Sequence, residues 1–335
     1  MRRVRDLIAG AVQAVPILRI ASVRQMLPLL AAVVALLVLF RCVVPRFLTA
    51  ENMLDLAQQI SINAILAFGM TLTILIGGID LSVGRVVAVV GTSTVGVLLA
   101  GGGEEQNLWH LGGAMAAGMG AAAAFGAFNG ICAAKTKMPP FIITLGTMLI
   151  ARGAALRFNK GLPMHIPNSQ TAFLALGNAR LLGIVPVPVI VMALLFALTA
   201  ILLHRTRFGQ HLYAMGGNRE AARFTGIPLV RIEVAVYMLC SLLAGVAGMI
   251  HASQLYSAEP ASGEGFELSA IAAAVVGGTS FTGGRGTMYG TLVGAIIIGI
   301  LDKGLNQAGV HFSLQYVVKG LVILAAVYID VRRRK

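Results

Sequence analysis

Apolar residues gather along the chain in ten long segments separated by short polar or glycine-rich breaks. The segments lie at residues 27–44, 53–77, 82–100, 112–134, 139–157, 184–203, 231–252, 268–282, 286–303 and 313–330. Runs of about 18 apolar residues match the thickness of a bilayer, and such runs must be helical because lipid offers no water to the backbone. The pattern predicts an all-α integral membrane protein with about ten transmembrane helices, of which the eighth is short and glycine-rich, hence broken or re-entrant.

Composition supports this interpretation. Hydrophobic residues make up 57% of the 335 residues and charged residues only 12%, and the mean hydropathy is +0.85. The 40 glycines also fit, since small residues let membrane helices approach closely. A soluble domain of this size would need more charged residues to cover its surface.

Charge placement gives the orientation. The net charge of +13 is not a nucleic-acid surface, because the cations lie at the chain ends and in short loops without interleaved aromatic residues. Cytoplasmic loops of membrane proteins carry the excess of Lys and Arg. With the N-terminus inside, the cytoplasmic stretches hold the cations at 2–24, 85, 135–137, 205–231, 285 and 332–335. An even number of spans then places both termini in the cytoplasm.

The expected organisation has three parts. Residues 1–25 form a basic cytoplasmic N-terminal segment, residues 26–331 form the transmembrane domain, and residues 332–335 form a basic cytoplasmic tail. Within the domain, residues 204–230 are the longest cytoplasmic loop.

Two similar blocks suggest an internal repeat. Asp80-Leu81-Ser82 is followed by Ala88–Ser93, and Glu267-Leu268-Ser269 is followed by Ala274–Ser280. The blocks open the third and eighth spans, and this odd offset places them in opposite orientation, as inverted-topology repeats require. We expect the solute pathway to lie between the two halves, although chance similarity among Ala, Val and Gly is an alternative.

No constellation for catalysis is found. The six histidines are dispersed without a paired ligand spacing, and the three cysteines show no CxxC spacing. The stretch 278–285 looks like a phosphate-binding loop, but Gly284 and Arg285 stand where a Walker A motif has Lys and Ser or Thr. We therefore expect no enzyme activity, no cofactor and no metal, and any ATP must be hydrolysed by another subunit.

The loop 204–231 contains one short helix signal, from Arg219 to Thr225. Asn218 can cap its start, and Gly226 with Pro228 can end it. So short a helix is unstable alone in water, so we expect it to dock on a partner, presenting Phe224 and Leu229 beside Arg219 and Arg223. Docking on anionic lipid headgroups is the alternative.

Charged and polar residues within the spans are the other candidates. Burying a charge in lipid is costly, so Asp80 and Glu267 are either pathway or gate residues or caps of the following helices. Uncharged polar residues such as Asn63 and Thr71 could line a cavity for a neutral hydroxylated solute, or join helices as packing contacts. No ladder of intramembrane acids resembles a proton relay.

Several blocks together resemble a known family. They are Gly69-Met70-Thr71, the stretch 77–84 (GGIDLSVG), the stretch 139–142 (PPFI), the stretch 205–209 (RTRFG), Gly216-Gly217-Asn218, Glu267-Leu268, the stretch 277–280 (GGTS) and the stretch 283–286 (GGRG). From about residue 28 to 331, the chain is similar to the permease subunit of ribose-type ABC sugar importers.

The resemblance implies a type II importer fold with inverted repeats in the bacterial inner membrane. It also implies a second permease copy, a cytoplasmic ATPase with two fused nucleotide-binding domains, and a periplasmic sugar-binding protein. In similar permeases a short cytoplasmic helix docks in the ATPase groove, which here corresponds to 216–228. The residues expected to couple to the ATPase are Asn218, Arg219, Glu220, Ala221, Arg223, Phe224 and Gly226.

Two positions depart from the family pattern and bear on solute selection or gating. Arg85 stands where a small residue is common, and Ser269 where an acidic residue often follows Glu267-Leu268. The complete set of pathway or gate candidates is Asn63, Thr71, Asp80, Ser82, Arg85, Phe141, Thr144, Glu267, Ser269 and Thr279.

We therefore expect the membrane subunit of an ATP-driven importer of a monosaccharide, such as a ribose-like pentose or a hexose. A stand-alone secondary transporter or facilitator is the second hypothesis, and would show buried ligands for a coupling ion. A membrane-embedded enzyme is the third.

Overall fold

The computed structural model describes residues 26–101 and 107–332. The N-terminal segment 1–25 and residues 333–335 of the expected tail lie outside the described residues.

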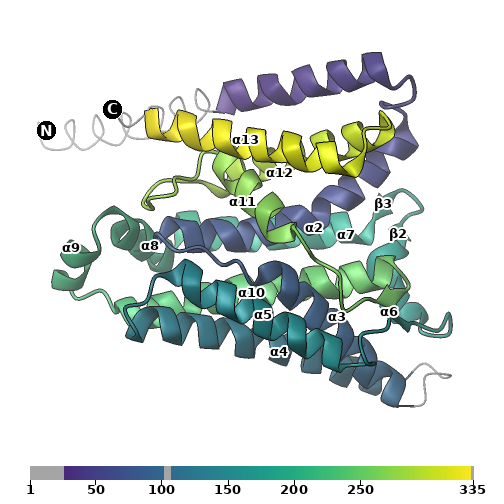
Figure 1. Cartoon of the computed structure of the whole chain (residues 1–335), viewed down its shortest axis with the longest axis horizontal. Helices are drawn as coiled ribbons and strands as arrows, with labels where there is room; N and C mark the ends of the chain where they lie inside the picture. Colours follow the sequence, from purple (N-terminus) through teal and green to yellow (C-terminus); the bar gives the residue numbers. More distant parts are fainter. Residues whose placement is uncertain (1–25, 102–106, 333–335) are drawn as a thin grey trace, which may run out of the picture.

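The described chain is almost entirely helical (Figure 1). The helices are Met26–Val43, α2 (Ala50–Leu75), α3 (Val83–Ala100), α4 (Leu108–Lys135), α5 (Pro140–Arg157), α6 (Thr171–Asn178), α7 (Val187–Arg205), α8 (Arg207–Gly217), α9 (Arg219–Phe224), α10 (Leu229–Gln254), α11 (Phe266–Val276), α12 (Met288–Gln307) and α13 (Phe312–Arg332). Two antiparallel pairs of two-residue strands complete it: β1 (Met164–His165) with β4 (Ser257–Ala258), and β2 (Arg180–Leu181) with β3 (Val185–Pro186).

The expectation of an all-α membrane protein is confirmed. Each predicted apolar segment coincides with a helix, and among the described residues eight helices are long and apolar enough to cross a membrane. The eighth segment is shorter than predicted, because α11 ends at Val276 after 11 residues. The apolar part of α13, Phe312–Tyr328, is also below span length. The count of ten crossings therefore stays a prediction.

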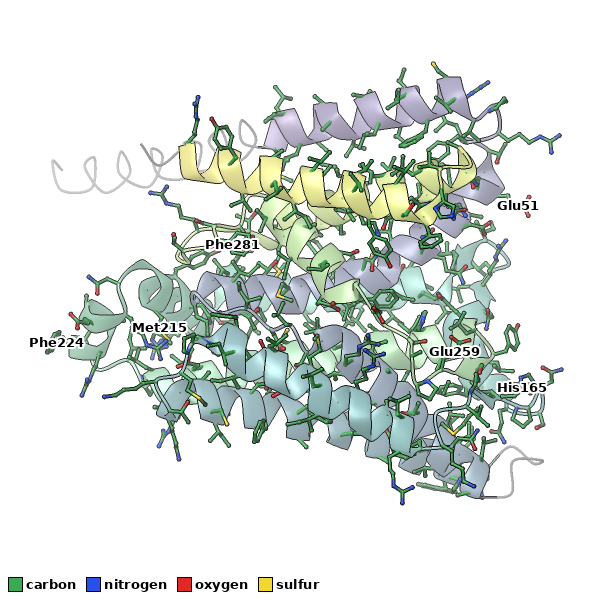
Figure 2. All side chains as sticks on the ribbon, in the orientation of Figure 1. Glu51, His165, Met215, Phe224, Glu259 and Phe281 are labelled. Carbon is green, nitrogen blue, oxygen red and sulfur yellow. The ribbon has the colours of Figure 1, made fainter. Side chains whose placement is uncertain are left out.

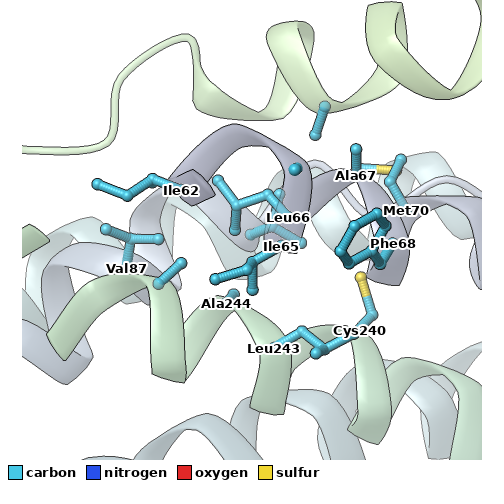
Figure 3. Close-up of a cluster of buried hydrophobic side chains, with 14 of the residues drawn as sticks. Ile62, Ile65, Leu66, Ala67, Phe68, Met70, Val87, Cys240, Leu243 and Ala244 are labelled. Carbon is cyan, nitrogen blue, oxygen red and sulfur yellow. The ribbon is translucent and has the colours of Figure 1, made fainter. Parts of the chain in front are cut away.

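Helix α2 lies at the centre of the fold, where it crosses α10 (Figures 1 and 3). Ile65 and Phe68 of α2 are completely buried, and Figure 3 shows this stretch of α2 facing Cys240 and Leu243 of α10. By contrast, α5 and α13 leave most of their large apolar side chains exposed, including Leu149. An apolar outer surface of this kind suits contact with lipid rather than water.

The two central helices run in opposite directions. The start of α2 and the end of α10 both contact α6: the Gln58 amide donates to the Gly177 carbonyl at 2.8 Å, and the Ser253 hydroxyl accepts from the Gly177 N–H at 2.8 Å. At its other end, the Leu75 carbonyl of α2 accepts from Gly284 N at 2.9 Å, beside Gly216 of α8, which leads through α9 into the start of α10.

Helices α3 and α11 show the same inversion. Their starts meet, because Gly84 of α3 packs directly on the backbone of Gly263, just before α11. From this junction α3 runs toward the end that carries β1 and β4, where Gly96 contacts Phe158. Helix α11 runs the other way, toward the 277–287 turn that binds Leu75. This arrangement supports the inverted repeat expected from the Asp80 and Glu267 blocks.

Close approach of α4 and α10 depends on two glycines one turn apart. A Cβ at Gly126 would lie 2.7 Å from the Met238 Cα, and one at Gly130 would lie 2.6 Å from the Val234 Cα. Small residues with this spacing let helix backbones touch. A Cβ at Gly120, on the same helix, would meet no atom of another element within 4 Å.

We predict that Gly126→Leu destabilises the protein strongly and Gly120→Leu does not. The first substitution forces α4 away from α10, and overpacking of this kind costs about 1–3 kcal/mol or more. The two variants make the same chemical change on the same helix. The measurement is the midpoint of thermal unfolding in detergent, and equal midpoints for the two variants would contradict the packing described above.

Candidate functional site

A cavity of about 750 Å³ lies among α2, α6, α10, α11, α12 and α13. It is at the end of α10 opposite α9, because its walls use the start of α2, the end of α10, the end of α12 and the start of α13. The lining is rich in amides, carboxylates and ammonium groups, from Asp55, Gln58, Gln59, Asn63, Asn178, Gln254, Glu264, Asp302, Lys303, Asn306, Gln315 and Lys319. Such walls can hydrogen-bond a small polar solute.

One face of α2 supplies much of this polar wall. Asp55, Gln59 and Asn63 recur four residues apart, Gln58 lies beside Gln59 and three residues after Asp55, and all four line the same cavity, as the helical period allows. Of these four, the sequence analysis selected only Asn63. Polar residues at helical spacing along an apolar segment indicate one polar face of a helix, and this spacing is visible in the sequence around Asn63.

The charges of the cavity are largely paired. Lys319 contacts Asp302 at 3.0 Å, and Arg180 contacts Asp55 at 3.6 Å. Arg85 contacts Glu264 at 2.7 Å. Among the described residues, no group of His, Cys, Asp and Glu has the arrangement of a metal site. The cavity therefore suits an uncharged solute better than an ion.

Arg85 links α3 to the segment that leads into α11. Its side chain is only 6% exposed and donates to the carbonyls of Ala261 at 3.0 Å and Ser262 at 3.4 Å, besides its contact with Glu264. The interpretation of Arg85 as a cytoplasmic loop cation is therefore wrong, because Arg85 is buried against the segment that leads into α11. Its partners lie far away in sequence, so the pattern around it gave no signal.

The remaining acidic candidates do not line the cavity. Asp80 is completely buried, and its Oδ1 accepts from Ser82 N at 2.9 Å, from the Ser82 hydroxyl at 2.6 Å and from the Asn129 amide at 3.4 Å. These bonds close a tight turn just before α3, whose N-cap residue is Ser82 and not Asp80. Glu267 is half-buried in the first turn of α11, where it accepts from Gly265 N at 3.3 Å.

The other candidates are spread over the fold. Asn63 and Ser269 line the cavity. Thr71 bonds Thr291 at 2.6 Å and so joins α2 to α12, and the Thr144 hydroxyl donates to the Ile79 carbonyl at 3.1 Å. Thr279 is buried in the 277–287 turn, and Phe141 is exposed on the outer face of α5.

The opposite end of the molecule carries the short helix that the sequence predicted. Helix α9 begins after Asn218, whose side chain accepts from Ala221 N at 2.9 Å, and it is followed by Gly226 with a φ of +80°. Phe224 is 89% exposed at the extremity of the molecule (Figure 2). Glu220 and Arg223 are exposed beside it.

Two details of this end differ from expectation. Arg219 pairs with the buried Glu233 of α10 and so anchors α9 to the membrane domain, and Leu229 is half-buried against the core. Helix α8 was also missed: it lies within residues 204–230, which were expected to form a cytoplasmic loop with one short helix. Burial raises the pKa of Tyr213 in α8 to about 12, and its hydroxyl donates to the Gly286 carbonyl at 2.7 Å.

Comparisons with known proteins bear on what this arrangement does. Residues 52–327 match the family model described as "Branched-chain amino acid transport system / permease component". The chain is 44% identical over 308 residues to the ribose import permease protein of Escherichia coli K12, covering 90% of this chain and 94% of the relative. It is 45% identical over 286 residues to that of Bacillus subtilis 168, covering 85% and 86%.

The chain is also 36% identical over 292 residues to the L-arabinose transport system permease protein of Escherichia coli K12, covering 87% of this chain and 86% of the relative. No solved structure matches.

We predict that Arg85→Met destabilises the protein by about 1–3 kcal/mol, because it removes the hydrogen bonds that the buried Arg85 side chain donates to the carbonyls of Ala261 and Ser262. Glu264→Gln removes only the ion pair, whose carboxylate is 69% exposed, and should cost less than about 1 kcal/mol. Thermal unfolding in detergent measures both. Equal losses would show that the charge pair, and not the carbonyl bonds, holds the junction.

Proposed function

The chain belongs to the family of permease components of the branched-chain amino acid transport systems, and we propose that it forms the solute path of an ATP-driven importer of a monosaccharide. It is a multi-pass membrane permease subunit and a transport component rather than an enzyme. The comparisons favour this function over a stand-alone secondary transporter.

A monosaccharide is the proposed solute class for two reasons. The relatives are named for ribose and L-arabinose, which are small neutral sugars. The cavity offers amide groups that both donate and accept hydrogen bonds, and ion pairs that leave little net charge. A branched-chain amino acid, by contrast, would need an apolar pocket beside a site for its two charged groups.

The single observation that carries the coupling proposal is α9. It projects at the end of the molecule opposite the cavity, with an exposed phenylalanine and flanking charges, and Arg219 ties it to buried Glu233 of α10. An exposed aromatic residue on an anchored helix is a typical anchor for a partner groove. The proposed partner is a cytoplasmic ATPase with two fused nucleotide-binding domains.

The remaining partners and the location complete the proposal. The α9 end faces the cytoplasm of a bacterium, because Arg205, Arg207, Arg223, Arg231 and Arg285 cluster around it. Both termini then lie in the cytoplasm, and the protein lies in the inner membrane. A periplasmic sugar-binding protein delivers the solute to the cavity end, and a second permease copy stands beside this chain.

In this mechanism, ATP-driven closure of the ATPase moves α9, and the movement reaches the cavity through α10 and α2. The path is continuous: Arg219 pairs with Glu233 at the start of α10, and the end of α10 supplies His251 and Gln254 to the cavity wall. On α2, Leu75 contacts the turn at Gly284, and the start of the same helix supplies Gln58 and Gln59. Each helix therefore joins the two functional ends directly.

The test is sugar uptake into proteoliposomes that contain the permease, the ATPase and the binding protein. We expect uptake only with all three components and ATP. Phe224→Asp should abolish both uptake and co-purification of the ATPase, because it removes the exposed anchor, while membrane insertion is unchanged.

The matched control is Trp109→Asp, which changes an aromatic residue that is 92% exposed at the start of α4, away from α9. Uptake by the permease alone would contradict the proposed function. Unchanged ATPase binding by the Phe224→Asp variant would remove α9 from the coupling surface.

A further inference from the structure

Asp80, in the segment between α2 and α3, is a completely buried acid whose two oxygens are bonded unequally. Three donors converge on Oδ1: Ser82 N at 2.9 Å, the Ser82 hydroxyl at 2.6 Å and the Asn129 amide at 3.4 Å. Oδ2 is also buried, and it has no hydrogen-bond partner among the described residues. An ionised carboxylate is an acceptor at both oxygens, whereas a protonated one has an acceptor and an O–H donor. The unequal bonding therefore matches a neutral acid with Oδ1 as its carbonyl and Oδ2 as its hydroxyl.

A second buried oxygen without a partner belongs to the side chain that already bonds Asp80. Asn129 of α4 is completely buried, and its amide nitrogen donates to Asp80 Oδ1 and, at 2.9 Å, to the Ser82 hydroxyl. Asn129 Oδ1 accepts from no group of the described residues. A buried acceptor without a donor is costly and rare. Only the acid form of Asp80 has a hydrogen to donate, so a proton on Asp80 Oδ2 supplies the donor that the pair lacks.

The charges around Asp80 do not compensate a negative charge on it. None of the ion pairs among the described residues includes Asp80. The titratable side chains of α10 that interact with it are Tyr237 and Cys240, and both types are ordinarily neutral at pH 7. The other charged groups that act on Tyr237, Glu233 and Arg219, pair with each other.

Two other ways of stabilising an ionised Asp80 are weaker. The start of α3 offers a partial positive charge, but the Ser82 N–H that bonds Asp80 reaches Oδ1 and leaves Oδ2 without a donor. A water molecule would satisfy both unpartnered oxygens but would not neutralise the charge. An unpaired carboxylate taken out of water is costly and is relieved by protonation.

We propose that Asp80 is a protonated, neutral acid in the folded permease, and that it forms with Asn129 an acid–amide pair that positions the turn between α2 and α3. The same turn is bonded to α5, because the Thr144 hydroxyl donates to the Ile79 carbonyl at 3.1 Å. Just before the turn, the Leu75 carbonyl accepts from Gly284 N.

Asp80 is therefore a positioning residue and not a charged gate. It holds the end of α2 that lies beside α8 against α4, and it does so without a charge. The inference goes beyond the proposed function and does not depend on the identity of the solute.

The first experiment is infrared spectroscopy of the full-length permease in lipid at neutral pH. The difference between the unmodified protein and the Asp80→Asn variant should contain the carbonyl stretch of one protonated carboxyl group. The band should move when the unmodified protein is made with carbon-13-labelled aspartate, a measurement that needs no variant. The matched control is Asp55→Asn, since Asp55 is 46% exposed and paired with Arg180, and this variant should keep the band.

The second experiment compares two substitutions in the complete transporter. Asp80→Asn keeps the shape and the neutral state, and its amide can accept from Ser82 and donate to Asn129 Oδ1. We expect it to import sugar within about twofold of the unmodified protein, which corresponds to less than half of a typical hydrogen bond. Asp80→Leu leaves the three donors of Oδ1 without their acceptor and should lower the midpoint of thermal unfolding by several degrees.

The absence of a protonated-carboxyl band that depends on Asp80 would overturn the proposal. Loss of uptake in an Asp80→Asn variant with an unchanged unfolding midpoint would also overturn it, because the charge would then be what transport requires. The spectroscopic result is independent of transport. A complete transporter that imports no sugar contradicts the proposed function, but the band still decides the protonation of Asp80.

Discussion

The fold depends on one constraint, that non-helical backbone placed inside a membrane protein must find its hydrogen bonds within the protein. Here the constraint acts where the starts of α3 and α11 meet. Arg85 supplies donors to the carbonyls of Ala261 and Ser262, and Gly84 lets the backbone at Gly263 approach closely. Because the junction is satisfied internally, both helices can begin inside the bundle and run apart. The same junction holds Glu264, which lines the cavity, against Arg85.

The cavity and α9 lie at opposite ends of the molecule, and the same two helices connect them. Helices α2 and α10 are each 26 residues long, or about 39 Å at 1.5 Å per residue, and they cross antiparallel through the core. Each has one end at the cavity and the other near α8 and α9. A movement of α9 can therefore reach the cavity through the continuous helices α2 and α10, without passing through loops. Helix α3 packs beside α10, and helix α11 packs beside α2.

The sequence predicted the helical segments and α9 well, because both rest on local rules. Apolar runs of bilayer length require helices, and Asn218 with Gly226 marks the two ends of a short one. Contacts across the sequence could not be predicted in the same way. Arg85 looked like a loop cation because its partners at 261–264 become neighbours only after α10 folds back. Asp80 and Glu267 were selected for their charge, but Asp80 lies in the turn before α3 and Glu267 in the first helical turn of α11, and neither lines the cavity. Gln58 and Gln59, which do line the cavity, were readable from helical spacing around Asn63. Helix α8 lies inside the stretch 204–230, which was expected to be a loop apart from α9.

The central claim is that the cavity opens away from α9 and that coupling at α9 changes its access. The most direct measurement uses a Gln59→Cys variant in a background without the native cysteines, in the complete transporter reconstituted with known orientation. A membrane-impermeant maleimide should label Cys at this position from the side opposite the ATPase when nucleotide is absent, and labelling from that side should fall when the ATPase is trapped with ATP. Equal labelling from both sides, or labelling that does not respond to nucleotide, would contradict the account.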